Sequence, residues 1–440
     1  MRVSVIGLGK LGCPLAALLA AKGHTVIGAD LSPELVAMVN AGKAPFEEPM
    51  LQEYLTLAGS RLSATVSVEE AALATDASMI IVPTPSLPDG TFSNSFLLGA
   101  IEAIGRGLRR KDGYHLVVVI STVMPGSCDG EVRTAIEAHS GRVLGESLGL
   151  CYGPEFVALG NVFRNMLAPD MVLIGQSDET AGDRLAAIYQ SVVENTPAVC
   201  RMNLVNAELT KLSVDTYVTT KISFANMLSE MCEHLPEADV ATVTEAMGMV
   251  QGIGDKCLKG AIGYGGPCFP RDNKALGALA QRLGTQSLIS DATDAINSRQ
   301  IWRLVAAVEA AISEGGRTVA VLGLAYKPGT SVIEESQSVA LVRLLIKAGH
   351  RVVIYDPVAM AAARDALPGA IPVATAEEAV AKADVVVIST AWQEFETILP
   401  QILQHSDRLI TVIDPWRVLP VSSHIEPLKV VTLGRGGRKF

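Results

Sequence analysis

A glycine-rich turn between a predicted strand and a predicted helix limits the fold of this chain more than any other feature. Residues 2–7 are a short apolar run, and an Ala/Leu-rich stretch ending near Gly23 follows the turn. A second apolar run, Thr25–Ala29, stops at Asp30. The turn consists of Gly7, Leu8, Gly9, Lys10, Leu11 and Gly12. The order strand, GxGxxG, helix, strand, acid is typical of a dinucleotide-binding unit.

Each glycine of this motif has its own physical reason. Gly7 makes the turn, Gly9 admits a pyrophosphate to the helix N-terminus, and Gly12 lets the helix pack closely on the strand. Asp30 would accept hydrogen bonds from a ribose diol and would repel a 2′-phosphate, so the sequence predicts NAD rather than NADP. The alternative is that Asp30 only ends a surface strand.

Strands and helices continue to alternate after this unit. Apolar runs at Ser78–Val82, Leu116–Ile120 and Met171–Ile174 predict strands, while residues 95–109 and 178–192 predict helices. This alternation predicts a doubly wound parallel sheet that binds ligands at the carboxyl ends of its strands. Residues that could face the cofactor there are Pro83, Thr84, Pro85, Ser121 and Thr122. As isolated features, such residues also occur in ordinary turns.

The middle of the chain predicts helices. Residues 203–234 contain no glycine or proline, which predicts a helix long enough for a central spine or a dimer interface. Lys211 and Asp215 are four residues apart and share one helix face, where a surface ion pair is the simplest explanation. Residues 273–312 predict further helix with an interruption near Gly284.

The last third of the chain repeats the alternation of the first. Its predicted strands are Thr318–Leu322, Arg351–Tyr355, Asp384–Ser389 and Leu409–Ile413. The loop at 323–330 lacks a GxGxxG motif, so we expect a different ligand there, with Lys327 on a phosphate. Residues 434–440 predict a flexible basic tail.

The sequence therefore predicts an α/β protein with two Rossmann-like, doubly wound parallel-sheet domains joined by a helical central domain. Its 440 residues exceed the roughly 250–300 at which a single core stops growing. We expect an NAD-binding domain at 1–196, a helical domain carrying a cysteine loop at 197–302, and a C-terminal α/β domain at 303–440.

Composition excludes several classes of partner. The net charge of −10 argues against a general nucleic-acid binder, and no apolar run approaches the ~18 residues of a membrane span. The first predicted strand begins at residue 2, so we expect no signal peptide. The seven cysteines lack CxxC or His spacing, so we expect a reducing cytoplasm and no structural zinc or other metal.

One of these cysteines, Cys268, lies in an unusual loop. The glycines among Gly263–Gly266 give the backbone access to positive φ, while Pro267 and Pro270 predict a rigid loop rather than a helix. Arg271 would favour the thiolate, which is the nucleophilic form. Ordinary packing of a buried cysteine is the alternative. Together with NAD, a reactive thiol predicts oxidation of an alcohol to a carboxylate through a thiohemiacetal and a thioester.

At this point the sequence resembles the UDP-glucose/GDP-mannose 6-dehydrogenase family over nearly its whole length. The matching stretches are Gly7–Gly12, Val82–Pro85, Ser121–Gly126, Gly153–Phe156, Ala207–Lys211, Ile222–Asn226, Gly263–Asp272, Gly323–Thr330 and Asp356–Pro357. The resemblance implies an NAD-dependent, four-electron oxidation of a nucleotide sugar. The expected substrate is a UDP-hexose, of the UDP-glucose type or a related or N-acetylated sugar, and GDP-mannose is the alternative. The resemblance also implies a homodimer built around the helical domain and a place in polysaccharide biosynthesis.

The resemblance implies roles for individual residues. Cys268 matches the nucleophile, Lys211 the cation that stabilises the oxyanion, and Asp272 a carboxylate that orders the site. Glu155 and Thr122 match residues that activate and position water. The remaining expected contacts are Asp215 beside Lys211, Arg271 at the cofactor, and Phe156, Tyr264, Gly265, Tyr326 and Lys327 at the substrate.

The sequence also departs from the family pattern. Asp215 replaces a usual Asn, Gly252 replaces an arginine that reaches across the subunit interface, and Leu159 replaces an acid. Further departures are Pro267, Arg271, Ser331 and Glu334. Two alternatives follow: a two-electron dehydrogenase of the hydroxyacid type, which needs no thiol, or a nucleotide-sugar-binding homologue with lost or altered turnover.

Overall fold

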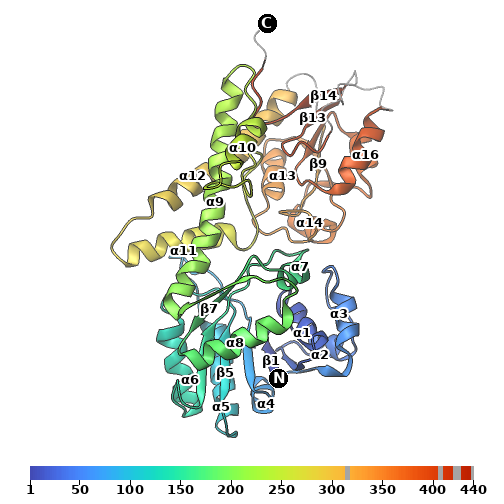
Figure 1. Ribbon diagram of the computed structural model, residues 1–440. Helices are drawn as coiled ribbons and strands as arrows, with labels where there is room; N and C mark the ends of the chain where they lie inside the picture. Colours follow the sequence, from blue (N-terminus) through green and yellow to red (C-terminus); the bar gives the residue numbers. More distant parts are fainter. Residues whose placement is uncertain (313–317, 405–409, 420–427, 438–440) are drawn as a thin grey trace. The chain divides into compact units, whose positions relative to one another are not determined.

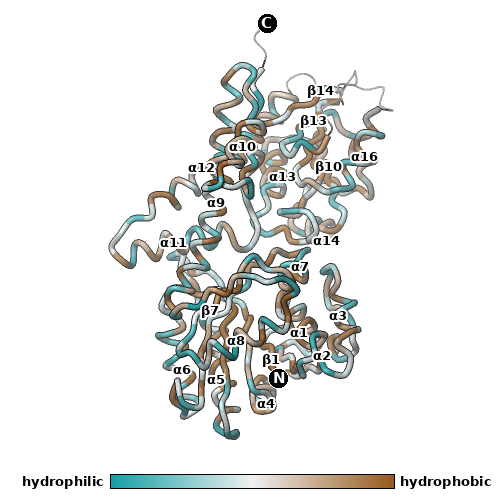
Figure 2. The backbone as a smooth tube through the Cα atoms, in the orientation of Figure 1, coloured by the Kyte–Doolittle hydropathy of each residue, from teal (hydrophilic) through white to brown (hydrophobic). Residues whose placement is uncertain are grey.

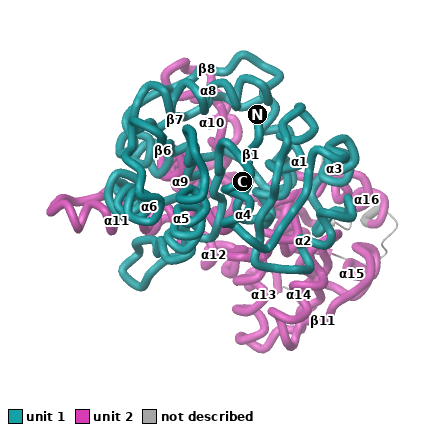
Figure 3. Tube along the Cα trace, turned by 90° about the horizontal axis from the view of Figure 1, so that it is seen from below, with its two compact units in different colours: residues 1–213 teal, residues 214–440 magenta. Residues whose placement is uncertain are grey.

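The computed structural model describes residues 1–312, 318–404, 410–419 and 428–437. The chain divides into two compact units, Met1–Ser213 and Val214–Phe440, which Figure 3 colours separately. Among the residues that the structure describes, every helix is too short or too polar to cross a membrane.

The first unit is built on an eight-stranded sheet with the strand order β3-β2-β1-β4-β5-β6-β7-β8. Neighbouring strands are parallel except for the pair β6 and β7. The strands are β1 (Arg2–Ile6), β2 (Thr25–Ala29), β3 (Leu62–Thr65), β4 (Ala77–Ile80), β5 (His115–Val119), β6 (Leu148–Tyr152), β7 (Met171–Gln176) and β8 (Ala198–Asn203). The order reverses direction between β1 and β4, the switch point of a doubly wound fold.

Helices cover both faces of this sheet. They are α1 (Gly12–Ala21), α2 (Pro33–Asn40), α3 (Leu51–Ala58), α4 (Val68–Ala74), α5 (Ser95–Leu108), α6 (Arg133–Ser140), α7 (Val162–Leu167) and α8 (Glu179–Val192), with a π-helical turn, η2 (Cys128–Val132), before α6. Alternate residues of β5 enter two different cores: Leu116 and Val118 pack with α1 and α8, and Val117 and Val119 with α5 and α6. Burial on both faces explains why the strands read as continuous apolar runs (Figures 1 and 2).

The second unit contains a smaller, all-parallel sheet with the order β11-β10-β9-β12-β13-β14. Its strands are β9 (Thr318–Leu322), β10 (Arg351–Tyr355), β11 (Ile371–Pro372), β12 (Val385–Ile388), β13 (Ile410–Ile413) and β14 (Leu428–Val431). Its helices are α13 (Gln337–Lys347), α14 (Met360–Ala366), α15 (Ala376–Lys382) and α16 (Gln393–Gln404). The predicted α/β class with two parallel sheets is therefore confirmed.

Long helices connect the two sheets along the chain. They are α9 (Leu204–His234), α10 (Val240–Gly248), α11 (Phe269–Arg282) and α12 (Leu288–Ile312). The break between α11 and α12 includes Gly284, as the sequence predicts. The prediction of a loop around Cys268 is wrong on one side, because α11 begins at Phe269 with Pro270 in its first turn. Proline fits there, since the first-turn N–H groups have no partner within the helix.

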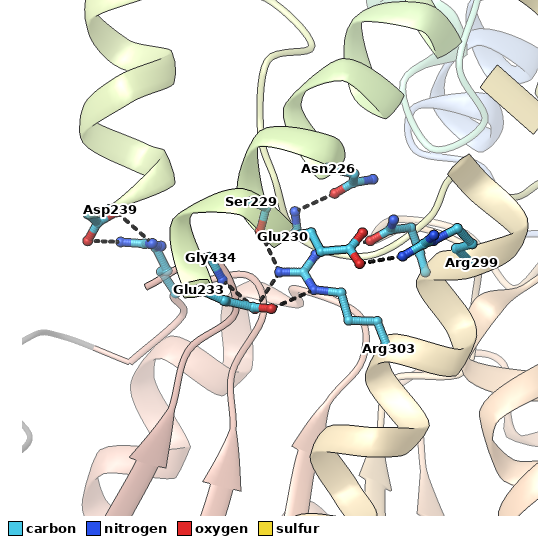
Figure 4. A network of polar contacts seen from close by, with 11 residues as sticks. Asn226, Ser229, Glu230, Glu233, Asp239, Arg299, Arg303 and Gly434 are labelled. Atoms are coloured by element: carbon cyan, nitrogen blue, oxygen red, sulfur yellow. Dashed lines mark hydrogen bonds and ion pairs between the residues drawn. The ribbon is translucent and has the colours of Figure 1, made fainter. Parts of the chain in front are cut away.

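The prediction of a flexible tail is also wrong over residues 434–437, the part of the tail that the structure describes. Gly434 N donates to the Glu233 carboxylate at 2.8 Å, and Gly436 N donates to Ala238 O at 2.8 Å. Between them, the backbone of Arg435 pairs with that of Asp239 in an isolated antiparallel β-bridge. Figure 4 shows this segment beside Arg303, which also pairs with Glu233. A Cβ on Gly434 would collide with Val240. The rest of the predicted tail, 438–440, lies outside the described residues.

Candidate active site

The glycine-rich turn forms the carboxyl edge of the first sheet at β1. Gly7 has a φ of +95°, and a Cβ there would lie 2.5 Å from Ile81 O. A Cβ on Gly12 would collide with the carbonyl of Gly7. A Cβ on Gly9 would meet nothing within 4 Å, so this backbone faces open space. The first and third glycines thus close the turn, and the second leaves the approach to α1 open.

Asp30, directly after β2, fixes this turn. Its Oδ2 accepts from Leu8 N at 2.7 Å and its Oδ1 from Ser32 N at 2.9 Å. Each carboxylate oxygen can accept a second bond, which leaves capacity for a ribose diol. The N-cap of α1 is Leu11, whose side chain cannot accept from the first turn, so the helix N-terminus suits an anion. These residues fit NAD.

The loops after β4 and β5, which the sequence predicts to lie near the cofactor, are hydrogen-bonded to each other. Thr84 Oγ1 donates to Thr122 O at 2.6 Å, and Ser121 Oγ donates to Val82 O at 2.7 Å. The hydroxyls of Thr84 and Ser121 therefore fix the loop backbones. Pro83 and Pro85 flank this contact, and the side chain of Thr122 is partly buried.

Glu155 follows β6 in a setting that favours a general base. Burial raises the pKa of its carboxyl to about 7, while a hydrogen bond with Tyr189 and the charge of Lys211 act in the opposite direction. Lys211 lies on α9, with Nζ 4.6 Å from the ring centre of Phe156, a cation–π contact. The structure thus brings together three of the predicted site residues, and a carboxylate that titrates near neutrality suits proton abstraction.

Glu208 is a further candidate residue that the sequence did not single out, since it lies within the predicted helix at 203–234. The side chain is fully buried. Its Oε2 accepts from Gly126 N at 2.6 Å and its Oε1 from Cys128 N at 2.7 Å. Burial raises the pKa of Glu208, and these donors act in the opposite direction. The signal available in the sequence was its place three residues before Lys211.

In the second unit, Cys268 is the N-cap residue of α11, and its side chain is exposed. Its carbonyl accepts from Asp272 N at 2.8 Å. Asp272 is buried, and Arg271 Nε donates to its Oδ1 at 3.0 Å. The positive end of α11 favours an anion such as a thiolate at this position. Asp215, also in this unit, is a buried residue of α9.

The glycine loop before the cysteine is held from two sides. On one side, Asn297 Oδ1 accepts from Tyr264 N at 2.8 Å, and Asp294 accepts from the Tyr264 hydroxyl at 3.0 Å. Burial and the Asp294 carboxylate raise the pKa of Tyr264. These contacts fix the orientation of the loop on α12.

On its other side the loop meets the C-terminal domain. A Cβ on Gly266 would lie 2.5 Å from the ring of Tyr326, and Gly266 N donates to Glu334 O at 3.2 Å. A Cβ on Gly265 would collide with the carbonyl of Glu335. The structure therefore gathers the predicted substrate contacts Tyr264, Gly265 and Tyr326 beside the cysteine loop. Lys327 follows in the same partly buried stretch after β9.

The fold and these sites define an NAD-dependent dehydrogenase with a second α/β domain beside a cysteine loop. Three models of one protein family match successive parts of the chain. The NAD-binding domain of the UDP-glucose/GDP-mannose dehydrogenase family matches residues 1–193, its central domain residues 205–299, and its UDP-binding domain residues 320–420. The chain belongs to this family, so it is an NAD-dependent dehydrogenase of the nucleotide-sugar 6-dehydrogenase type.

Individual relatives support the same assignment. UDP-glucose 6-dehydrogenase AglM of Haloferax volcanii is 36% identical over 422 residues, covering 95% of this chain and 97% of the relative. GDP-mannose 6-dehydrogenase of Azotobacter vinelandii is 32% identical, covering 90% and 93%. The structure of a UDP-glucose dehydrogenase from Pyrobaculum islandicum matches with a TM-score of 0.87 at 36% identity over 94% of each chain. The resemblance and the NAD cofactor predicted from the sequence are confirmed.

Proposed function

We propose that this protein oxidises the C6 hydroxymethyl group of a UDP-hexose, with UDP-glucose as the first candidate, to a carboxylate. The observation that carries the proposal is the placement of Cys268 at the N-terminus of α11, on a glycine loop packed against Tyr326 of the C-terminal domain. Two relatives at 36% identity, from Haloferax volcanii and Pyrobaculum islandicum, are a UDP-glucose 6-dehydrogenase and a UDP-glucose dehydrogenase. The GDP-mannose enzymes are less similar, at 32–33% identity.

The proposed chemistry converts the alcohol to an acid in two oxidations. NAD, when bound, accepts one hydride in each of them. The Cys268 thiolate adds to the intermediate aldehyde and gives a thiohemiacetal, whose oxidation leaves a thioester. Water then displaces the thiolate and releases the carboxylate. In total, one alcohol, two NAD⁺ and one water give one carboxylate, two NADH and three protons.

The roles proposed for the other residues follow from the chemistry of their side chains. Lys211 stabilises negative charge on the reacting oxygen. Glu155, with its pKa near 7, takes the proton of the attacking water, and Thr122 positions that water. The buried carboxylate of Asp272 accepts from Arg271 Nε at 3.0 Å and is proposed to order the site around the cysteine. Asp215 is proposed to pair with the charge of Lys211, in place of the amide usual in the family.

We further propose that the protein acts as a homodimer through α9. Three exposed apolar residues of this helix, Tyr217, Phe224 and Met231, recur at seven-residue intervals and therefore share a face. Tyr217 is 66% exposed and Met231 51%, which is a large apolar stripe for a surface helix. Light scattering of the purified protein measures the mass directly. A monomer at micromolar concentration would contradict the proposal.

The activity is tested with NAD and a panel of UDP- and GDP-sugars. We expect two NADH per sugar, a product heavier by about 14 Da, as the covalent route from CH₂OH to COOH requires, and loss of acid formation in Cys268→Ala. One NADH per sugar with an active Cys268→Ala variant would instead identify a two-electron dehydrogenase. Saturable binding without NADH would identify a homologue that only binds nucleotide sugars. Cys257→Ala is the matched control, because this thiol is also exposed.

A further inference from the structure

We propose that Glu208 is a positioning residue for the reaction. It holds the loop after β5, which carries Thr122, against the first turns of α9, which carry Lys211. The inference concerns residues of the first unit alone. It rests on the proposed function for the roles of Thr122, Lys211 and Glu155, but the contact itself is independent of those roles.

Burial of the Glu208 carboxylate is costly without hydrogen-bond donors. Glu208 is 0% exposed, and a buried charge is tolerated only where donors compensate for the lost water. The donors come from residues 80 and 82 positions earlier: Cys128 N at 2.7 Å and Gly126 N at 2.6 Å. Both oxygens are thus committed to one loop.

The backbone of that loop is shaped to present its amide to Glu208. Gly126 has a φ of +94°, and a Cβ there would meet nothing within 4 Å. Space therefore does not require glycine at this position, whereas the backbone conformation that directs its amide does. The other end of the loop is fixed by the bond from Thr84 Oγ1 to Thr122 O at 2.6 Å. Glu208 fixes the remaining end through its hydrogen bonds with Gly126 N and Cys128 N.

Glu208 lies close to Lys211, a proposed catalytic residue, on helix α9. Lys211 is three residues further on, and side chains with this spacing lie on one face about one turn apart. Its ammonium contacts the ring of Phe156 at 4.6 Å, and its charge lowers the pKa of Glu155 against the effect of burial. Fixing Glu208 on the β5 loop therefore fixes Lys211 relative to both Thr122 and Glu155.

A purely structural role would give a different outcome in kinetics. If Glu208 only caps the helical segment that starts at Cys128, its loss lowers stability and leaves the catalytic groups unchanged. If it positions Lys211, its loss weakens the interaction between Lys211 and Glu155. The pKa of Glu155 then rises, and the acidic limb of the kcat profile moves to higher pH, because the base must be deprotonated.

The test compares Glu208→Gln with Glu137→Gln. Glu137 is the matched control because its carboxylate also accepts from a backbone amide, that of Leu144 at 3.0 Å, but on α6. For Glu208→Gln we expect kcat at pH 7 to fall about 10-fold or more, since small misplacements of catalytic groups are costly. The KM for NAD should change less than about 3-fold, and the loss should shrink at high pH. Glu137→Gln should keep the wild-type profile.

Hydrogen exchange of residues 121–128 supplies a measurement that does not depend on activity. We expect faster exchange in Glu208→Gln than in Glu137→Gln. Gly126→Ala strains the same contact from the loop side. This variant should show the same faster hydrogen exchange and the same shift of the acidic limb to higher pH. It replaces Glu208→Gln in the test if Glu208→Gln does not fold. If the wild-type protein produces no NADH from any sugar, the proposed function is contradicted. Hydrogen exchange of residues 121–128 still tests whether Glu208 holds the loop.

Two results would overturn the positioning role. One is faster exchange of the loop in Glu208→Gln with an unchanged acidic limb and a kcat within about 2-fold of wild type, which assigns Glu208 to stability alone. The other is unchanged exchange, which means that the carboxylate does not hold the loop.

Discussion

The two sheets each place an aspartate directly after their second strand, but the two carboxylates have different surroundings. Asp30 follows β2, is partly exposed and accepts from two backbone amides, those of Leu8 and Ser32. Asp356 follows β10 and is 1% exposed. Its donors are the amides of Leu324, Ala325, Val358 and Ala359, at 2.7–3.0 Å, and the indole of Trp392 at 3.1 Å.

The carboxylate at this topological position therefore keeps acceptor capacity in the first sheet and is committed to the protein in the second. Asp356 has five donors on two oxygens, so its lone pairs are committed to the protein. It cannot accept a ribose diol in the manner available to Asp30. The second sheet therefore needs another way to hold a nucleotide, in agreement with the missing glycine motif in the loop after β9 and with the match of residues 320–420 to a UDP-binding domain.

The largest expected effect comes from Asp356→Asn. The amide group would turn its NH₂ toward backbone donors in a buried site and leave some of them unpaired. We expect a loss of about 3 kcal/mol in the free energy of unfolding, in the range for breaking a buried charged hydrogen-bond network. Denaturant titration measures it. The comparison fails if Asp30→Asn destabilises the protein equally, because Asp30 would then be a structural residue of the same kind.

The next effect uses a second difference between the sheets, their histidines. His115 of β5 is fully buried, with Nε2 2.9 Å from Ser78 Oγ, whereas His350 before β10 is partly exposed and lies 2.9 Å from Glu309. Burial, followed by the charges of Lys111 and Arg142, lowers the pKa of His115 to about 3. The unfolded chain binds this proton near pH 6.5 and the folded protein does not.

The stability due to neutral His115 is therefore present above about pH 6.5 and decreases as the pH falls toward 3. Linkage gives a loss of about 2 kcal/mol between pH 7 and pH 5 from this residue. Unfolding of wild type and of His115→Gln at both pH values isolates that contribution, since the variant should show a smaller dependence on pH. His350→Gln is the control. Equal pH dependence in wild type and His115→Gln would contradict the assignment.

Much of the fold could be predicted from the sequence because both faces of each sheet are buried. The runs at β1, β2, β5, β9 and β10 are strongly apolar and lie within one residue of their predicted bounds. Strands β3, β6 and β8 of the first sheet escaped prediction. β3 and β8 contain polar residues and are only partly buried. β6 contains Gly149 and pairs antiparallel with β7, so the alternating βα pattern does not indicate it.

The parts that failed depend on contacts between distant residues. Pro270 was interpreted as a loop residue, although proline is equally compatible with a first helical turn. The glycines at 434 and 436 suggested flexibility, but there they permit close packing on the α9–α10 corner. Glu208 gained its proposed role only once Gly126 and Cys128 were placed beside it. Local patterns identify elements and motifs, whereas such long-range partners appear only in the folded chain.

The smallest expected effect, and the one that most sharpens the comparison of the two aspartates, is that of Asp30→Asn on cofactor choice. An amide keeps one acceptor for the Leu8 or Ser32 amide, so stability should change by less than about 1 kcal/mol. The charge that repels a 2′-phosphate is lost, and a diol acceptor is weakened. We expect the KM for NAD to rise about 10-fold and the preference for NAD over NADP to narrow. Steady-state kinetics with both cofactors measures this change. Asp356→Asn is the comparison, because this variant, if it folds, should keep the wild-type preference for NAD over NADP. An unchanged preference in Asp30→Asn would mean that Asp30, like Asp356, serves only to hold its own loop.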